Sequence, residues 1–339
     1  MIHLYYLPTP EKDRWIPGDR FIRPWIRRIL RGKPRPGGVD KVFINLVEGL
    51  NRIQYPYTIN QPLKNRKYGD RILLLGRGLQ SLNGFENSPP FISGIGIFTH
   101  PCEVPNFTQT YPVLAYLSHS EWVNNLCKPY LGNLCHIWPA GVDTLKYKPI
   151  ENKKILNDFI LYDKLNFNRE TEVNRILEPI QKTLKEKGFT WKTIRYGHYQ
   201  SEDYQKLLSE SRYLLFLSPH ESQGLACQEA MASGLPVLAF DEGIVRDPYY
   251  IQCGSADLQV SSVPWFNNTC GLKFSSIDAF ADCLLEFKAR ADSGQFHPEK
   301  YIQEEFSLEA SAQKLLTLVE EIYAQKQTTS PTPSEHSHD

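Results

Sequence analysis

Two glutamates in one short stretch, Glu221 and Glu229, are the residues best suited to chemistry. They stand eight positions apart in HESQGLACQEAMASGLPVLAFDE, residues 220–242, with Gly224 between them. A loop that enters a helix leaves unpaired backbone N–H groups at the positive end of the helix dipole, where an anion such as phosphate binds. The two carboxylates could then hold hydroxyl groups on either side of a phosphate, which is the layout of a sugar nucleotide.

The elements around these glutamates are more restrictive than the pair itself. The apolar run LLFLS predicts a buried strand before Glu221, and a short helix from Leu225 carries Glu229. Gly234 and Pro236 end that helix, and the apolar residues 237–240 predict the next strand. Two glutamates at this spacing are common in helical proteins, so the order of strand, loop, helix, Gly-x-Pro and strand carries the interpretation.

This order of elements resembles the retaining glycosyltransferases of family four, the group 1 glycosyl transferases. The resemblance is strong over residues 155–275 and looser over residues 35–150. It implies an α/β protein of the GT-B fold, with two Rossmann-like parallel-sheet domains facing a central cleft. It also implies transfer of a sugar from a nucleotide-sugar donor to a saccharide or lipid-linked acceptor, with retention at the anomeric carbon.

The resemblance assigns roles to further residues. Gly37 and Gly38 precede a predicted helix over residues 39–50, where the family's Gly-Gly touches the donor diphosphate. The run GIGIFT, residues 94–99, predicts a strand that ends at His100, the position of the family's active-site histidine. Lys164 and Arg169 follow the strand DFILY, where the family places an arginine and then a lysine on the diphosphate; here the order is reversed.

The expected site therefore has two parts. Its catalytic residues are His100 and Glu221. Its donor-binding residues are Gly37, Gly38, Lys164, Arg169, Gly224, Leu225, Ala226 and Glu229. We expect no metal and no cofactor, because the sequence has no D-x-D pair suited to Mg²⁺ and the nucleotide-sugar donor is itself the substrate.

The expected domain organisation follows the family. An acceptor-side domain spans residues 1–150 and contains an insertion at 9–35. The donor domain spans 151–306, a helix over 307–326 crosses back to the first domain, and the polar residues 327–339 form a disordered tail.

Charge is distributed unevenly along the chain. Residues 1–150 hold 19 Lys and Arg against 10 Asp and Glu, a charge of +9, and the other residues balance it with −9. The segment 19–35, DRFIRPWIRRILRGKPR, interleaves basic and apolar residues. Two interpretations stay open for it: a solvated cover over the first domain, which we favour, or contact with an anionic membrane surface. No nucleic-acid recognition motif is present, so no nucleic acid is expected as a partner.

Composition predicts a cytoplasmic protein, with peripheral contact at the inner membrane face as the alternative. No apolar run is long enough to span a membrane, and the N-terminus lacks a secretory signal. Seven scattered cysteines without a C-x-x-C pair predict reduced thiols rather than zinc or a disulfide framework. Two alternatives to a transferase remain: a non-catalytic sugar-nucleotide-binding subunit and a GT-B-fold nucleotide-sugar epimerase.

Overall fold

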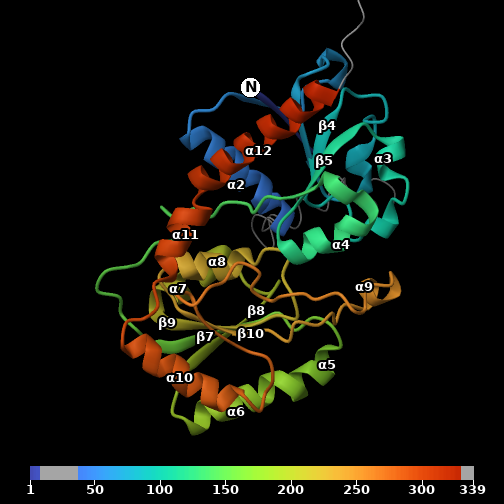
Figure 1. The fold of residues 1–339 in the computed structure, drawn as a ribbon. Coiled ribbons are helices and arrows are strands. Elements are labelled where there is room, and N and C mark those ends of the chain that lie inside the picture. Colours follow the sequence, from blue (N-terminus) through green and yellow to red (C-terminus); the bar gives the residue numbers. More distant parts are fainter. Residues whose placement is uncertain (8–36, 330–339) are drawn as a thin grey trace, which may run out of the picture.

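The computed structural model describes residues 1–7 and 37–329 of the chain (Figure 1). The predicted basic segment 19–35 lies outside the described residues, as do residues 330–339 of the predicted tail. The described chain forms two α/β units, each built on its own parallel sheet.

The first sheet has six parallel strands in the order β2-β1-β3-β4-β5-β6. They are β1 (Ile2–Leu7), β2 (Tyr57–Ile59), β3 (Arg71–Gly76), β4 (Phe91–Gly94), β5 (Val113–Ser118) and β6 (Cys135–Ile137). Strand β3 is buried on both faces: Leu73 and Leu75 join one apolar cluster, and Ile72 and Leu74 join another on the opposite face. A central strand covered on both sides needs a continuous apolar run, as RILLL supplies.

The second sheet has five parallel strands in the order β11-β10-β9-β7-β8. They are β7 (Asn157–Asp163), β8 (Trp191–Arg195), β9 (Ser211–Leu217), β10 (Val237–Phe240) and β11 (Gly271–Phe274). Alternate residues of β9 again enter opposite clusters, with Leu214 and Phe216 on one face and Leu215 and Leu217 on the other. The two sheets confirm the predicted architecture of two Rossmann-like parallel-sheet domains.

Helices flank both sheets (Figure 1). They are α2 (Gly38–Arg52), α3 (Phe107–Thr110), α4 (Glu121–Leu131), α5 (Arg169–Glu172), α6 (Glu178–Glu186), α7 (Ser201–Glu210), α8 (Leu225–Ala232), α9 (Pro248–Gln252), α10 (Phe280–Asp292), α11 (Pro298–Phe306) and α12 (Leu308–Thr329). A π-helical segment, Val173–Leu177, joins α5 to α6. Helix α8 lies between the two sheets in the view of Figure 1, and its residues from Cys227 to Ala232 are all buried.

The last helix, α12, returns to the first domain and lies beside α2 (Figure 1). Ala312 and Leu315 of α12 pack in the same apolar cluster as Leu46 of α2. The two helices approach closely at Gly49, where an added Cβ would come within 2.5 Å of the Leu308 carbonyl oxygen. The core of the first domain is therefore completed by the C-terminal end of the described chain.

Two expectations from the sequence are wrong in detail. Strand β4 ends at Gly94, so residues 95–99 are not the predicted strand leading to His100. The backbone turns there because Ile95 and Gly96 both have positive φ, at 27° and 88°, which an extended strand cannot contain. Helix α12 runs to Thr329, so residues 327–329 are helical and not part of a disordered tail.

Among residues 1–7 and 37–329, no helix combines the length and the apolar character needed to cross a membrane. The longest of them, α12, carries charged residues along its length, including Glu309, Lys314 and Glu320. The described helices therefore provide no membrane span.

Candidate active site

Glu221 lies in the loop after β9, at the carboxyl end of the second sheet. Its carboxylate accepts hydrogen bonds from Ser218 Oγ at 3.0 Å and from Lys164 Nζ at 2.8 Å. Its backbone N–H donates to the Ser261 carbonyl oxygen at 2.9 Å, which fixes the loop itself. Lys164 directly follows β7, the strand beside β9, so parallel pairing brings both residues to one edge of the sheet. The acid and the cation are thus held where ligands bind in sheets of this type.

Helix α8 begins at Leu225, four residues after Glu221. Gly224 is the N-cap residue and has left-handed backbone angles, φ 83° and ψ 45°, which a residue with a Cβ adopts at a cost. Gly224 has no side chain that could cap this end of the helix. The first N–H groups of α8, at Leu225 and Ala226, therefore keep the positive end of the helix dipole available to an anion. The sequence predicts an anion site at this position.

Glu229 lies on α8, one turn beyond those N–H groups, and it is paired across the domain interface. Its Oε1 accepts a hydrogen bond from Lys41 Nζ of α2 in the first domain. The Glu229 side chain is only 5% exposed, and its Oε2 has no hydrogen-bond partner among the described residues. A buried carboxylate oxygen without a donor is costly, so this oxygen is suited to accept a hydrogen bond from a bound hydroxyl group.

The predicted diphosphate contact at Gly37 and Gly38 has a different local structure. Gly37 is the N-cap residue of α2, and its N–H donates to Asp40 Oδ2 at 2.7 Å. The Asp40 carboxylate also accepts from the Tyr6 hydroxyl and pairs with Arg77 at 3.2 Å. A carboxylate of the chain itself thus occupies the N-terminal end of α2, and a diphosphate at Gly37 would compete with it.

The two cations after β7 have separate partners. Lys164 binds Glu221, and its Nζ also lies 4.5 Å from the centre of the Tyr196 ring. Arg169 forms a two-pronged ion pair with Asp163, the last residue of β7, with Nη1 2.5 Å from Oδ1. This hydrogen-bonded pairing raises the pKa of Arg169. Arg169 compensates a buried carboxylate, whereas Lys164 contacts Glu221 of the predicted sugar site.

His100 is completely buried, and both of its ring nitrogens have partners. Nδ1 accepts the backbone N–H of Cys102 at 3.1 Å, so Nε2 carries the proton and donates to Ser255 Oγ of the second domain at 2.9 Å. Burial lowers the pKa of His100, against a smaller opposing effect of Glu103, and favours the neutral ring. A sugar could receive the Nε2 proton only by replacing Ser255.

An aromatic group joins His100 to the loop of Glu221. The His220 ring stacks with Phe167 and with Tyr250, at ring-centre distances of 5.8 and 5.5 Å, and the Tyr250 ring centre is 6.0 Å from that of His100. Trp122 of the first domain contacts His220 edge-on and donates its indole N–H to the Glu221 carbonyl oxygen at 2.8 Å. These contacts place the loop of Glu221 and the segment of His100 on opposite sides of one interdomain contact.

Several residues of this region have no distinguishing signal in the sequence. In the sequence, Lys41 cannot be distinguished from lysines on a protein surface. Trp122 stands in a pattern that predicts only the start of a helix. Gln223 is buried, and its amide group donates to the Ala140 carbonyl oxygen and accepts the Ala140 N–H. Ser255 follows α9 in a polar loop. Their roles depend on how the two domains meet, so local pattern could not find them.

The fold and this arrangement define a two-domain α/β protein of the GT-B type, with an acid, a cation and a helix N-terminus at the interface. Residues 177–248 match the family model for glycosyl transferases group 1. The matched range is less than half of the chain. That match contains Glu221, Gly224 and Glu229. No curated protein matches the chain over its sequence at a significant level.

Solved structures of glycosyltransferases share the fold at low sequence identity. AviGT4, a glycosyltransferase involved in avilamycin A biosynthesis, is 14% identical, with a TM-score of 0.55 over 95% of this chain and 98% of its own. Anabaena Alr3699/HepE, in complex with UDP and glucose, is 10% identical, with a TM-score of 0.54 over 94% and 99%. The lipopolysaccharide outer core galactosyltransferase WaaB is 12% identical, with a TM-score of 0.52 over 94% and 99%. Together, the family match and these neighbours support a glycosyltransferase with the GT-B fold.

Proposed function

We propose that this protein transfers a sugar from a nucleotide-sugar donor to a saccharide or lipid-linked acceptor, with retention and without a metal ion. One arrangement carries the proposal: Lys164 holds the Glu221 carboxylate beside the N-terminus of α8, which no N-cap side chain closes. On the same helix, Glu229 has one carboxylate oxygen, Oε2, without a hydrogen-bond partner among the described residues. The proposed ligand pair matches what the Anabaena Alr3699/HepE structure contains, UDP and glucose.

The proposed chemistry is mainly electrostatic. The bond between the anomeric carbon and the diphosphate breaks, leaving negative charge on the phosphate and positive charge in the sugar ring. The N–H groups of Leu225 and Ala226, together with Lys164 and Arg169, would stabilise the departing diphosphate. Glu221 would hold sugar hydroxyl groups through the transition state, and Glu229 would hold those of the ribose. Groups already oriented toward the charge that develops are commonly the largest source of rate enhancement.

Donor binding under this proposal changes several ion pairs and hydrogen bonds of the structure. Lys164 must contact both Glu221 and the diphosphate. The ribose must either replace Lys41 as the partner of Glu229 Oε1 or bind that oxygen together with Lys41. Gly37 and Gly38 would reach the diphosphate only with Asp40 displaced. His100 would contact the donor sugar or the incoming hydroxyl group after losing Ser255. These exchanges make donor binding a step in which contacts between the domains are rearranged.

A thermal-shift panel of UDP, GDP, ADP and CMP, with their common sugars, tests donor binding. A ligand that binds only the folded protein stabilises it by about 2.7 kcal/mol at a hundredfold excess over Kd. We expect one nucleoside diphosphate to raise the melting temperature, and Glu229→Gln to remove most of that shift. Glu202→Gln, an exposed carboxylate on α7, serves as the control and should bind normally. No shift with any nucleotide would refute the donor site.

Turnover and stereochemistry are tested with the nucleotide that binds. Glu221→Gln should reduce turnover by about 100-fold or more, whereas Glu202→Gln should not. Proton NMR of the product should show the anomeric configuration of the donor, and added EDTA should leave the rate unchanged. An inverted product would contradict retention, and a rate lost in EDTA and restored by Mg²⁺ would contradict metal independence.

A non-catalytic sugar-nucleotide-binding protein is the second candidate. The observation that favours it is His100, which is buried with both ring nitrogens occupied. In that case a nucleotide sugar should bind with the dependence on Glu229 described above, but no sugar should be released or transferred. His100→Ala should then leave donor binding unchanged, and there would be no sugar transfer for the substitution to abolish.

A further inference from the structure

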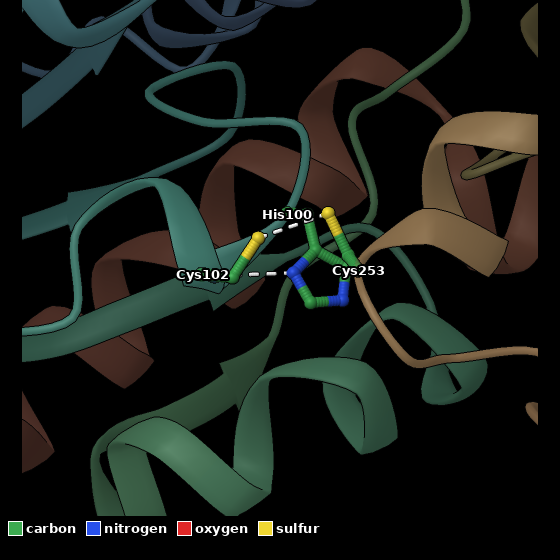
Figure 2. Close-up of side chains that lie close together, drawn as sticks. All are labelled: His100, Cys102 and Cys253. Carbon is green, nitrogen blue, oxygen red and sulfur yellow. Dashed lines mark hydrogen bonds between the residues drawn. The ribbon is translucent and has the colours of Figure 1, made fainter.

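Two cysteines from different domains face each other near His100 (Figure 2). Cys102 belongs to the short 3-10 helix Pro101–Glu103 of the first domain, and Cys253 directly follows α9 in the second. Their Sγ atoms are 2.9 Å apart, although the residues are 151 positions apart in the sequence. Both side chains are half-buried, so small solutes can reach them. The chain therefore brings two thiols together across the domain interface.

Hydrogen bonds on both sides of the cysteines hold this contact in register. His100 Nε2 lies 2.9 Å from Ser255 Oγ, two residues away from the respective cysteines. The Tyr249 hydroxyl donates to Glu103 Oε1 at 2.9 Å. These two bonds fix the turn that carries Cys102 against the end of α9, so the thiols meet as part of a built interface.

We propose that Cys102 and Cys253 form a reversible disulfide bond that joins the two domains when the protein meets a peroxide. The thiolate of one cysteine attacks a peroxide oxygen to give a sulfenic acid and water. The second thiol then attacks that sulfur, forming the S–S bond and releasing a second water. The two thiols lose two electrons and two protons, and hydrogen peroxide is reduced to two waters. A dithiol reductant reverses the change.

A metal site formed by His100, Cys102 and Cys253 is the competing interpretation, because their ligand atoms lie within 4.8 Å of one another. Two observations disfavour it. Both nitrogens of His100 are already hydrogen-bonded. The two sulfurs are 2.9 Å apart, whereas two sulfurs on a tetrahedral zinc ion, each about 2.3 Å from it, lie about 3.8 Å apart. The geometry thus favours a bond between the sulfurs.

The disulfide would tie the segment of His100 to the second domain at the position seen in Figure 2. Its formation does not depend on sugar transfer, and it would restrict separation of the domains whatever ligand they hold. The contact with Cys253, and then burial, raises the pKa of the Cys102 thiol to about 11. Because the thiolate is the reactive form, oxidation should be faster at pH 9 than at pH 7.

Peptide mapping after oxidation tests the proposal on the full-length protein. After treatment with hydrogen peroxide and alkylation of remaining thiols, we expect a cross-linked peptide that contains Cys102 and Cys253 and disappears with dithiothreitol. The melting temperature should rise by about 5 °C or more, because the bond constrains the unfolded chain. Cys102→Ser and Cys253→Ser should each lose both effects. Cys283→Ser, another half-buried cysteine, should keep both.

Other outcomes would overturn the proposal. Alkylation of both cysteines after peroxide treatment, with no cross-linked peptide, would show that the thiols do not couple. Binding of one equivalent of Zn²⁺ by the reduced protein, lost in Cys102→Ser and accompanied by protection from peroxide, would assign a metal site instead. The cross-link is measured first in the unaltered protein, so a variant that fails to fold leaves the test intact.

Discussion

The ion pair between Lys41 and Glu229 gives the sharpest test of how the domains meet. Glu229 is 5% exposed and Lys41 is 18% exposed, so both charges have lost most of their water. Replacing Lys41 with methionine keeps the length of the side chain and removes the charge. Glu229 would then be left without a partner on either oxygen, since Oε2 already has none among the described residues.

The expected loss follows from this burial. Breaking a fully buried pair by removing one partner costs about 3–5 kcal/mol, and the partial exposure of Lys41 lets water replace some of the interaction. We therefore expect Lys41→Met to lower the free energy of unfolding by about 2–3 kcal/mol. The exposed pair of Lys182 and Glu186 on α6 is the control. There, Lys182→Met should change stability by less than about 1 kcal/mol.

Urea unfolding of the single and double variants is the assay. If the pair exists, Lys41→Met combined with Glu229→Gln should cost less than the sum of the single changes, by about 2 kcal/mol, because the neutral amide leaves no unpaired charge. Additive effects, or a Lys41→Met variant as stable as the Lys182→Met control, would refute the pairing and with it the domain arrangement at α2 and α8.

Three further predictions test other parts of the structure. Gly96→Ala should destabilise the protein more than Gly84→Ala in thermal melts. Both glycines have similar positive φ, 88° and 86°, so the backbone strain of an added Cβ is matched. Of the two positions, only at Gly96 would the new Cβ meet a backbone atom, the Gly76 carbonyl oxygen at 2.1 Å. Equal losses would contradict the tight turn before His100. Burial lowers the pKa of His119 to about 4, so the unfolded chain takes up a proton first as the pH falls below about 6.5, and stability should decrease from there to about pH 4. In urea titrations, His119→Gln should reduce this loss of stability with falling pH. The same loss in the variant would show that the pKa of His119 is not lowered in the folded protein. Gln223→Leu should cost about 2–3 kcal/mol, because it leaves the N–H and the carbonyl oxygen of Ala140 unpaired in a buried position; a loss below 1 kcal/mol would show that water replaces the amide.

Much of the fold could be predicted from local pattern. Runs such as RILLL and LLFLS are apolar throughout because their strands are covered on both faces, and this alone predicts parallel sheets with helices on each side. The helix at Leu225 and its entry glycine were predictable because Gly224, Gly234 and Pro236 mark both ends. The placement of Glu221 and Lys164 at one sheet edge also follows from parallel pairing, since each directly follows a strand or its short loop.

The partners of the charged groups could not be predicted in this way. Lys41 and Glu229 are 188 positions apart and belong to different domains. Arg169 is paired with Asp163 six positions earlier, a choice that depends on the turn between β7 and α5. Local pattern constrains neighbours along one strand or helix, whereas these contacts depend on side-chain rotamers and on the rigid placement of one domain against the other.

The sequence by itself determined the two parallel sheets and the strand, loop and helix that present Glu221, Gly224 and Glu229, because apolar periodicity and glycine positions act over a few residues. Only the tertiary structure decided that His100 is hydrogen-bonded to Ser255, that the preceding strand ends early at Gly94, and that Cys102 meets Cys253. The strand end is decided within the first domain, where Gly96 lies against the Gly76 carbonyl oxygen. The contacts of His100 and of the two cysteines arise where the two domains meet, and burial of both surfaces at once selects among side-chain partners that no single segment specifies.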